Sequence, residues 1–344
     1  MPNKDLTAKL VLGSGYDPWY NLAVEEYLLE KLTEGEIILY LWQNDNTVVI
    51  GRNQNAWQEC RVGKLEDNGG KMARRLSGGG AVFHDRGNLN YTLIMPKKVY
   101  DLEEQLTVVI DALNDLGIAA QFSGRNDIVC QGKKISGNAF YYGAKGAYIH
   151  GTVLVDSDLD KLSSYLKVSE AKIKSKGIDS VTARVMNLTA VDEQLSIEDV
   201  QKSIQSNFRE LYNEGQPLSR IEIKDNKRIQ ELYDKYSSWE WRFGENPECD
   251  ISFNTRFEWG EVEFNFKLTA GNIEEAVLYS DAMYGDLIGR IADCLTGQPF
   301  KLSSILQLVE EVLADYQFPS PMRGQKITQE FLEWLESELK EIVY

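Results

Sequence analysis

Apolar residues in the first half of the chain gather in short runs separated by polar turn residues, a pattern that predicts strands. Ile37 to Trp42 and Thr47 to Arg52 are β-branched and aromatic runs on either side of a QNDN cluster, which predicts a β-hairpin. Asn90 to Met95 is a third such run and ends at Pro96. A second hairpin is expected around the turn residues Gln131 and Gly132, with a strand over Tyr148 to Val155 after it.

Helical periodicity is confined to fewer segments. Asp17 followed by Pro18 predicts a helix that begins near Pro18. Between Asp101 and Leu116 apolar residues recur at helical spacing, with Gly117 at the expected C-terminal cap. The last segment aligns four apolar residues on one helical stripe, namely Phe331, Leu335, Leu339 and Ile342.

The order of these elements favours an α+β fold with a mixed, mainly antiparallel sheet, because tight turns join most of the strands. The pattern of apolar and polar residues changes after the loop-like stretch GENPECD. Beyond it, FEWGEVEFNFKL predicts a pair of strands, and three helical segments follow. We therefore expect two domains, residues 1–248 and a small α+β domain over residues 249–344.

Composition narrows the function classes. The 344 residues carry a formal net charge of −16, which disfavours nucleic acid or an anionic membrane as a partner. A local run over Lys161 to Lys176 holds five lysines and one glutamate, typical of a solvated face or of a docking surface for an acidic partner. The four cysteines form no CxxC pair and no signal sequence or long apolar run is visible, so we expect a cytoplasmic, reduced protein.

The stretch RRLSGGGAVFHD, Arg74 to Asp85, carries the first candidate chemistry. Neither a P-loop nor a dinucleotide fingerprint fits, because Ala81 and Val82 follow the glycines and no helix pattern does. Two interpretations remain. In the first, the glycines allow the main chain to lie against a nucleotide, and the two arginines bind a phosphate or carboxylate. In the second, the stretch is a tight hairpin with arginines on the surface.

A second stretch, NDIVCQGKKISGNAFYY, favours the first reading. It joins an Asn-Asp pair, two lysines and an SG dipeptide between Asn126 and Tyr142. A lysine at a site lined with backbone donors can hold an acyl carbonyl and a phosphate oxygen together, as an acyl-adenylate requires. Taken alone, Lys133 or Lys134 is more typical of an exposed hairpin lysine.

Six blocks in this order resemble the lipoate-protein ligase A family: DPWYNLAVEEYLL, TVVIGRNQNAWQEC, RRLSGGGAVFHDRGNLNYTLIM, NDIVCQGKKISGNAFYY, HGTVLVDSDL and KGIDSVTARVMNL. The resemblance is close over residues 15 to 190 and looser in the C-terminal accessory domain. It implies that this domain rotates relative to the catalytic domain after adenylation, with Trp239 to Asp250 as the expected hinge. It implies a biotin/lipoate ligase type of fold. It also implies that ATP and Mg²⁺ activate lipoate to lipoyl-AMP, and that the lipoyl group then passes to a lysine of lipoyl-domain proteins, the E2 subunits of 2-oxoacid dehydrogenases and the glycine cleavage H protein.

The resemblance also assigns residues. Lys134 corresponds to the essential lysine at the lipoyl carbonyl and phosphate, and Asp127 to a residue at the acceptor lysine or the metal. Lipoate binding is implied for Lys134, His150 and Gly151. Binding of ATP and lipoyl-AMP is implied for Arg75, Ser77, Gly78, Gly79, Gly80, Ala81, Val82, Phe83, His84, Asn126 and Lys134.

Three alternatives stay open at this point. A transferase that needs no ATP would work through a cysteine thioester, with Cys130 as the candidate. A biotin ligase shares the adenylation chemistry, and a non-catalytic lipoyl-binding protein shares the scaffold. The histidines and cysteines show no metal-ligand spacing, and the choice between lipoate and octanoate is not visible in the sequence.

Overall fold

The computed structural model describes residues 6–123, 126–167, 184–244 and 249–343. The expected hinge and the basic run therefore lie partly outside the described residues. Contacts divide the chain into two units. Unit 1 comprises residues 1–50, 56–75 and 81–242, and unit 2 comprises residues 51–55, 76–80 and 243–344. Within the described residues no helix is both long and apolar enough to cross a membrane.

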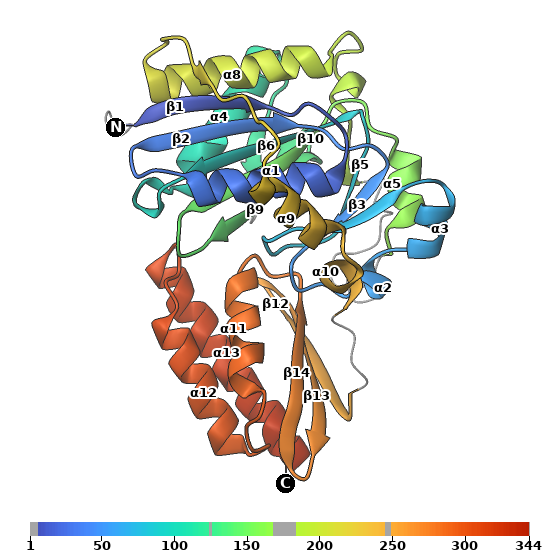
Figure 1. Cartoon of the computed structure of the whole chain (residues 1–344), viewed down its shortest axis with the longest axis vertical. Helices are drawn as coiled ribbons and strands as arrows, with labels where there is room; N and C mark the ends of the chain where they lie inside the picture. Colours follow the sequence, from blue (N-terminus) through green and yellow to red (C-terminus); the bar gives the residue numbers. More distant parts are fainter. Residues whose placement is uncertain (1–5, 124–125, 168–183, 245–248, 344) are drawn as a thin grey trace. The chain divides into compact units, whose positions relative to one another are not determined.

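Unit 1 is built on a mixed sheet (Figure 1). Its strands are β1 (Thr7–Leu12), β2 (Glu36–Trp42), β6 (Asn88–Met95), β7 (Gln121–Ser123), β8 (Asp127–Cys130), β9 (Lys133–Tyr142), β10 (Ala147–Leu154) and β11 (Ser219–Arg220). They lie in the order β11-β1-β2-β6-β10-β9-β8-β7. The pairs β11/β1 and β1/β2 are parallel and the others are antiparallel, so the expected α+β class with a mainly antiparallel sheet is confirmed.

Helices cover both faces of this sheet. One face carries α4 and α8, which pack on each other, and the other carries α1 and α9 (Figure 1). Among the described residues, unit 1 has the helices α1 (Pro18–Lys31), α2 (Ala56–Glu59), α3 (Val62–Asp67), α4 (Leu102–Asp115), α5 (Leu159–Tyr165), α8 (Ile197–Asn213), α9 (Lys227–Ser237) and α10 (Trp239–Phe243). It also has the 3₁₀ turns η1 (Lys97–Val99) and η2 (Leu188–Ala190). Asp17 caps α1 and Asp101 caps α4, both as expected.

The first expected hairpin is wrong in its pairing. Both strands exist, but β2 lies in the large sheet, whereas β3 (Thr47–Ile50) pairs with β4 (Lys71–Arg74) and β5 (Val82–His84) in a separate sheet. The polar residues between the two strands are only partly solvated: Asp45 is exposed, but Asn44 is fully buried and hydrogen-bonded to Asn21. The cluster instead carries the chain from one sheet into the other.

The second expected hairpin is confirmed. Strands β8 and β9 pair antiparallel around Gln131 and Gly132, both of which have positive φ angles of 51° and 75°. Two successive residues with positive φ match the right-handed twist of the flanking strands. This turn determines which residues of β8 and β9 face each other.

Unit 2 contains an antiparallel sheet and three helices. They are β12 (Ile251–Phe257), β13 (Gly260–Thr269), β14 (Asn272–Ser280), α11 (Gly285–Leu295), α12 (Leu302–Asp315) and α13 (Pro321–Val343). Rings of the sheet stack against α13, for example Phe264 on Phe331 with ring centroids 6.0 Å apart. Leu335 and Leu339 are fully buried as expected, but Ile342 is 38% exposed because it lies near the end of the helix.

The glycine strip belongs to unit 2 by its contacts. The N–H of Gly79 donates to the Ala282 carbonyl at 2.9 Å, and Asn53 donates through Nδ2 to the carbonyl of Gly285 at 2.7 Å. A Cβ placed on Gly78 would lie 2.0 Å from the Ala282 oxygen, whereas one on Gly80 would meet nothing within 4 Å. Close backbone packing therefore requires the glycine at position 78 but not at position 80.

Two alanine variants separate these reasons for glycine. We expect Gly78→Ala to lower the free energy of unfolding by about 1–3 kcal/mol, because the backbone of residues 282–283 must move to admit the methyl group. Gly80→Ala should change it by less than about 0.5 kcal/mol. Urea denaturation of both variants measures the difference. Equal losses would show that packing against Ala282 does not explain Gly78.

Candidate functional site

One face of the large sheet carries a row of polar side chains contributed by neighbouring strands. Tyr40 of β2 pairs with Thr92 of β6, and Thr92 pairs with His150 of β10. Because directly paired residues point to the same side of a sheet, these side chains share one face. Trp42, Asn90 and Thr152 form the next row along the same strands. The sheet thus presents a polar face inside unit 1.

Glu25 of α1 binds this face. Its side chain is 1% exposed, and its Oε1 accepts from Thr92 Oγ1 at 2.7 Å and lies 2.9 Å from His150 Nδ1. Trp42 Nε1 donates in turn to Thr92 Oγ1 at 3.0 Å. Because a carboxylate only accepts, the proton of the His150 ring lies on Nδ1 toward Glu25. The ring orientation of His150 is therefore set from α1.

A chain of hydrogen bonds sets the ring of His84. The Tyr40 hydroxyl donates to Asn21 Oδ1, and Asn21 Nδ2 donates to Asn44 Oδ1 at 3.0 Å. Asn44 Nδ2 then lies 3.1 Å from His84 Nδ1, which must accept, so Nε2 carries the proton. Among the described residues this buried Nε2 has no hydrogen-bond partner. A buried donor without a protein partner is a position where a ligand acceptor fits.

Arg75 supplies a buried positive charge to the same region. Its side chain is 5% exposed, its N–H donates to the Ile50 carbonyl at 3.0 Å, and its Nη1 donates to the Val49 carbonyl at 3.3 Å. Burial lowers the pKa of Arg75 to about 10, and Tyr148 and Glu25 act in the opposite direction. The guanidinium is still protonated at neutral pH, so an anion bound beside it would be strongly stabilised.

Arg74 differs from its neighbour. Its guanidinium donates to the main-chain carbonyls of Trp241 and Arg242, at 2.9 Å each. The Arg74 guanidinium therefore binds main-chain carbonyls of unit 1, whereas the Arg75 side chain donates to the Val49 carbonyl. Arg75 is the member of the pair that remains a candidate for phosphate binding.

Lys134 and Asp127 meet at the other end of the polar face. Lys134 Nζ lies 2.7 Å from Asp127 Oδ1, with the two side chains about one third exposed. A Cβ on Gly137 would lie 2.6 Å from Lys134 Nζ, so the glycine of the ISG motif gives the lysine room to lie across the sheet. Lys133 is exposed. The structure therefore separates the two lysines that the sequence left adjacent.

The other predicted site residues have diverse surroundings. Asn126 Nδ2 donates to the Asn138 carbonyl at 2.6 Å and so orders the start of β8. Gly151 is packed on Asn138, because a Cβ there would lie 2.1 Å from the Oδ1 of that residue. Phe83 is buried against the Tyr165 ring. The glycine-rich stretch is divided between the two units: unit 1 includes Ala81, Val82, Phe83 and His84, and unit 2 includes Ser77, Gly78, Gly79 and Gly80.

Sequence reasoning missed two residues that organise the site, Glu25 and Asn44. Glu25 lies within NLAVEEYLL, seven residues after the Pro18 start of α1, on the buried side of the helix with Leu22 and Leu28. Residues 21–25 of α1 are all buried, so the helix has no narrow apolar stripe on which a carboxylate would stand out. Glu26 follows at an equivalent helical spacing from Leu22, so no local pattern singles out Glu25.

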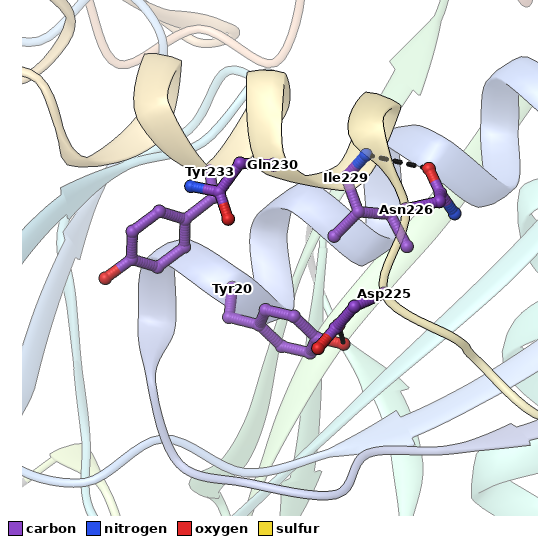
Figure 2. Close-up of a pocket in the computed structure, with 6 residues that line it drawn as sticks. All are labelled: Tyr20, Asp225, Asn226, Ile229, Gln230 and Tyr233. Atoms are coloured by element: carbon purple, nitrogen blue, oxygen red, sulfur yellow. Dashed lines mark hydrogen bonds between the residues drawn. The ribbon is translucent and has the colours of Figure 1, made fainter.

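A separate pocket of about 160 Å³ lies between the ends of α1 and α9 (Figure 2). The Tyr20 hydroxyl donates to Asp225 Oδ1 at 2.7 Å, and burial, together with Asp225, raises the pKa of Tyr20 to about 12. Asn226 closes one side of the pocket and caps α9 through the N–H of Ile229. The pocket contains none of the predicted site residues, so it is not the candidate site.

The described residues contain no group of three or more His, Cys, Asp or Glu side chains that could hold a metal ion.

Comparisons with known proteins define the class. Residues 17–209 match the lipoyl protein ligase A/B catalytic domain, and residues 246–335 match the bacterial lipoate protein ligase C-terminus. The chain therefore belongs to the lipoyl protein ligase family. It is 39% identical over 304 residues to the lipoate-protein ligase A of Psychrobacter cryohalolentis, which covers 86% of this chain and 90% of that protein.

Solved structures share the fold. LipL1 of P. falciparum, in complex with lipoate, has a TM-score of 0.78 at 24% identity and covers 95% of this chain and 99% of its own. A bipartite lipoate protein ligase of Thermoplasma acidophilum, studied with its E2 lipoyl domain, has a TM-score of 0.61 at 29% identity, covering 72% and 100%. A lipoate-protein ligase A bound with ATP has a TM-score of 0.59 at 28% identity, covering 70% and 99%.

The burial of His84 predicts a pH dependence of stability. Burial, with smaller effects of Arg75 and His150, lowers the pKa of His84 from 6.5 to about 3. On acidification the unfolded chain therefore takes up a proton first, so stability that is complete above pH 6.5 is lost as the pH falls toward 3. The loss is at most about 1.4 kcal/mol per pH unit.

Urea denaturation at pH 7.5 and pH 5.0 measures this loss, with His84→Gln as the comparison. We expect the variant to lose less stability than the wild type between the two pH values. Identical losses would contradict a neutral, buried His84.

Proposed function

We propose that this protein is an ATP-dependent lipoate-protein ligase that forms lipoyl-AMP and transfers the lipoyl group to a lysine of a lipoyl-domain protein. The observation that carries the proposal is the Lys134–Asp127 pair on the same sheet face as His150 and Glu25, together with the buried Arg75 cation. Family membership, the relative that is a lipoate-protein ligase A and the ATP-bound ligase structure support it.

In the first step a carboxylate oxygen of lipoate attacks the α-phosphorus of ATP, and the bond between this phosphorus and the β-phosphate oxygen breaks. Pyrophosphate leaves with the bonding electrons. The attacking carboxylate is already ionised at neutral pH, so the step needs stabilisation of negative charge more than it needs a base. Lys134 and Arg75 provide positive charge, and the Nε2–H of His84 is a further donor.

In the second step the amine of the acceptor lysine attacks the carbonyl carbon of lipoyl-AMP. The bond from this carbon to the phosphate oxygen breaks, AMP leaves, and an amide forms. The amine must lose a proton, and Asp127 or a phosphate oxygen of AMP takes it. Mg²⁺ bound with the nucleotide would neutralise phosphate charge. Asp127 would hold it only if a phosphate oxygen, and not Asp127, accepts the proton, because one carboxylate cannot serve both roles.

The acceptor is proposed to be a lipoyl domain, as in E2 subunits or the glycine cleavage H protein. An E2 lipoyl domain accompanies the bipartite ligase of Thermoplasma acidophilum, and the net charge of −16 disfavours nucleic acid or an anionic membrane as the partner.

The transferase alternative would need an accessible nucleophile at Cys130, which is 1% exposed. Its burial supports the ligase over the thioester route.

Lys134→Ala tests the first step. We expect lipoate-dependent pyrophosphate release from ATP to fall by roughly 10²–10³-fold, because the positive charge at the reacting groups is lost. Lys133→Ala is the matched control, since that side chain is exposed on the same strand, and its activity should stay within about twofold. Wild-type release from Lys134→Ala would refute the assignment, and no release from the wild type would refute the ligase function itself.

Asp127→Asn tests the second step. Transfer from preformed lipoyl-AMP to a purified lipoyl domain should slow by roughly 10²-fold, because the amide side chain cannot accept the lysine proton. Single-turnover measurement of lipoylated domain gives this rate without a contribution from adenylation. A wild-type transfer rate would exclude Asp127 as the base.

A further inference from the structure

Arg74 and Trp241 exchange hydrogen bonds in both directions. The Arg74 guanidinium donates through Nε to the Trp241 carbonyl and through Nη2 to the Arg242 carbonyl, at 2.9 Å each. In return the indole Nε1 of Trp241 donates to the Arg74 carbonyl, also at 2.9 Å. These residues are 167 positions apart in the sequence, and all of them belong to unit 1.

Each partner supplies what the other requires. Trp241 and Arg242 lie in α10, and the carbonyls at the end of a helix have no partner inside the helix. Arg74 is 1% exposed, so its guanidinium needs acceptors within the protein. Two donors on one planar group bind two successive carbonyls, which a lysine cannot do in the same geometry.

The indole of Trp241 fixes one end of the peptide bond between Arg74 and Arg75. The Arg74 carbonyl of this peptide accepts a hydrogen bond from the indole N–H. The Arg75 N–H of the same peptide donates to the Ile50 carbonyl at 3.0 Å. A peptide unit is planar, so fixing both polar groups fixes its orientation. The direction in which the Arg75 side chain leaves the backbone is thereby set.

We propose that Arg74 and Trp241 are positioning residues for Arg75 in the adenylation step, acting through the orientation of the Arg74–Arg75 peptide. This inference rests on the proposed function, in which Arg75 binds a phosphate of ATP. It makes α10 part of the machinery that prepares the nucleotide end of the site. Neither residue touches the substrate in this role.

The chain offers a matched pair of variants. Trp241→Phe removes one indole N–H and keeps an aromatic ring. Trp19→Phe removes an equivalent bond, because Trp19 Nε1 donates to the Met72 carbonyl at 3.0 Å on the same strand, two residues before Arg74. The two variants lose the same kind of hydrogen bond to β4, and only Trp241→Phe frees the peptide next to Arg75.

The measurement is lipoate-dependent pyrophosphate release at varied ATP and varied lipoate, with thermal unfolding recorded for each protein. We expect Trp241→Phe to raise the KM for ATP about tenfold with the KM for lipoate unchanged, and Trp19→Phe to leave both constants within about twofold. Equal effects of the two variants, or equal changes in both KM values, would show that Trp241 serves only the stability of the fold.

Arg74→Lys provides a second route if Trp241→Phe folds poorly. It keeps the charge but cannot bind both carbonyls, so the same rise in the KM for ATP is expected. The double variant should show little further change, because each substitution breaks the same linkage. If the increases in KM for ATP of the two single variants multiplied in the double variant, the proposal would be overturned.

The outcomes also separate this inference from the proposed function. A wild type that releases no pyrophosphate would refute the proposed function and this inference with it. An active wild type whose variants all behave alike would refute the inference alone.

Discussion

The burial of the Glu25 carboxylate is the constraint on which the arrangement of unit 1 depends. A carboxyl group buried beneath a helix needs hydrogen-bond partners, and here Thr92 of β6 and His150 of β10 both contact its Oε1. The requirement fixes how α1 lies on the sheet, and it orients the His150 ring at the same time. A polar interaction that the fold needs in order to bury α1 therefore also prepares the face on which the proposed chemistry takes place.

The glycine-rich stretch serves more than one purpose. Gly78 is needed for close backbone packing on Ala282, and Gly79 uses its N–H in the same contact. Gly80 has no such neighbour, so a reason based on ligand approach applies most directly there. A run of glycines that resembles a single binding motif thus combines residues with different physical requirements.

Features determined by neighbouring residues could be predicted from the sequence, whereas features determined by distant ones could not. The Asp17 cap and the Gln131–Gly132 turn depend on the backbone preferences of a few adjacent residues, and both are found in the structure. The pairing of β3 depends on β4 and β5, and no local pattern distinguishes these partners from β2. The roles predicted for Lys134, Asp127 and the glycines stay predictions, although the geometry places Lys134 beside Asp127. Arg74 and Arg75 are indistinguishable in the sequence. Their surroundings differ because the Arg74 guanidinium donates to main-chain carbonyls of α10, which is distant in the sequence.

The division of the chain into units has a consequence for how such a protein can be assembled in evolution or in the laboratory. Unit 2 is not a simple C-terminal appendage, since residues 51–55 and 76–80 are grouped with it by contacts although they are encoded within unit 1. A single genetic junction near Phe243 would therefore transfer most of unit 2 but leave two of its loops behind. Exchange of the accessory region between relatives that carry it in one chain therefore requires matched changes in those loops.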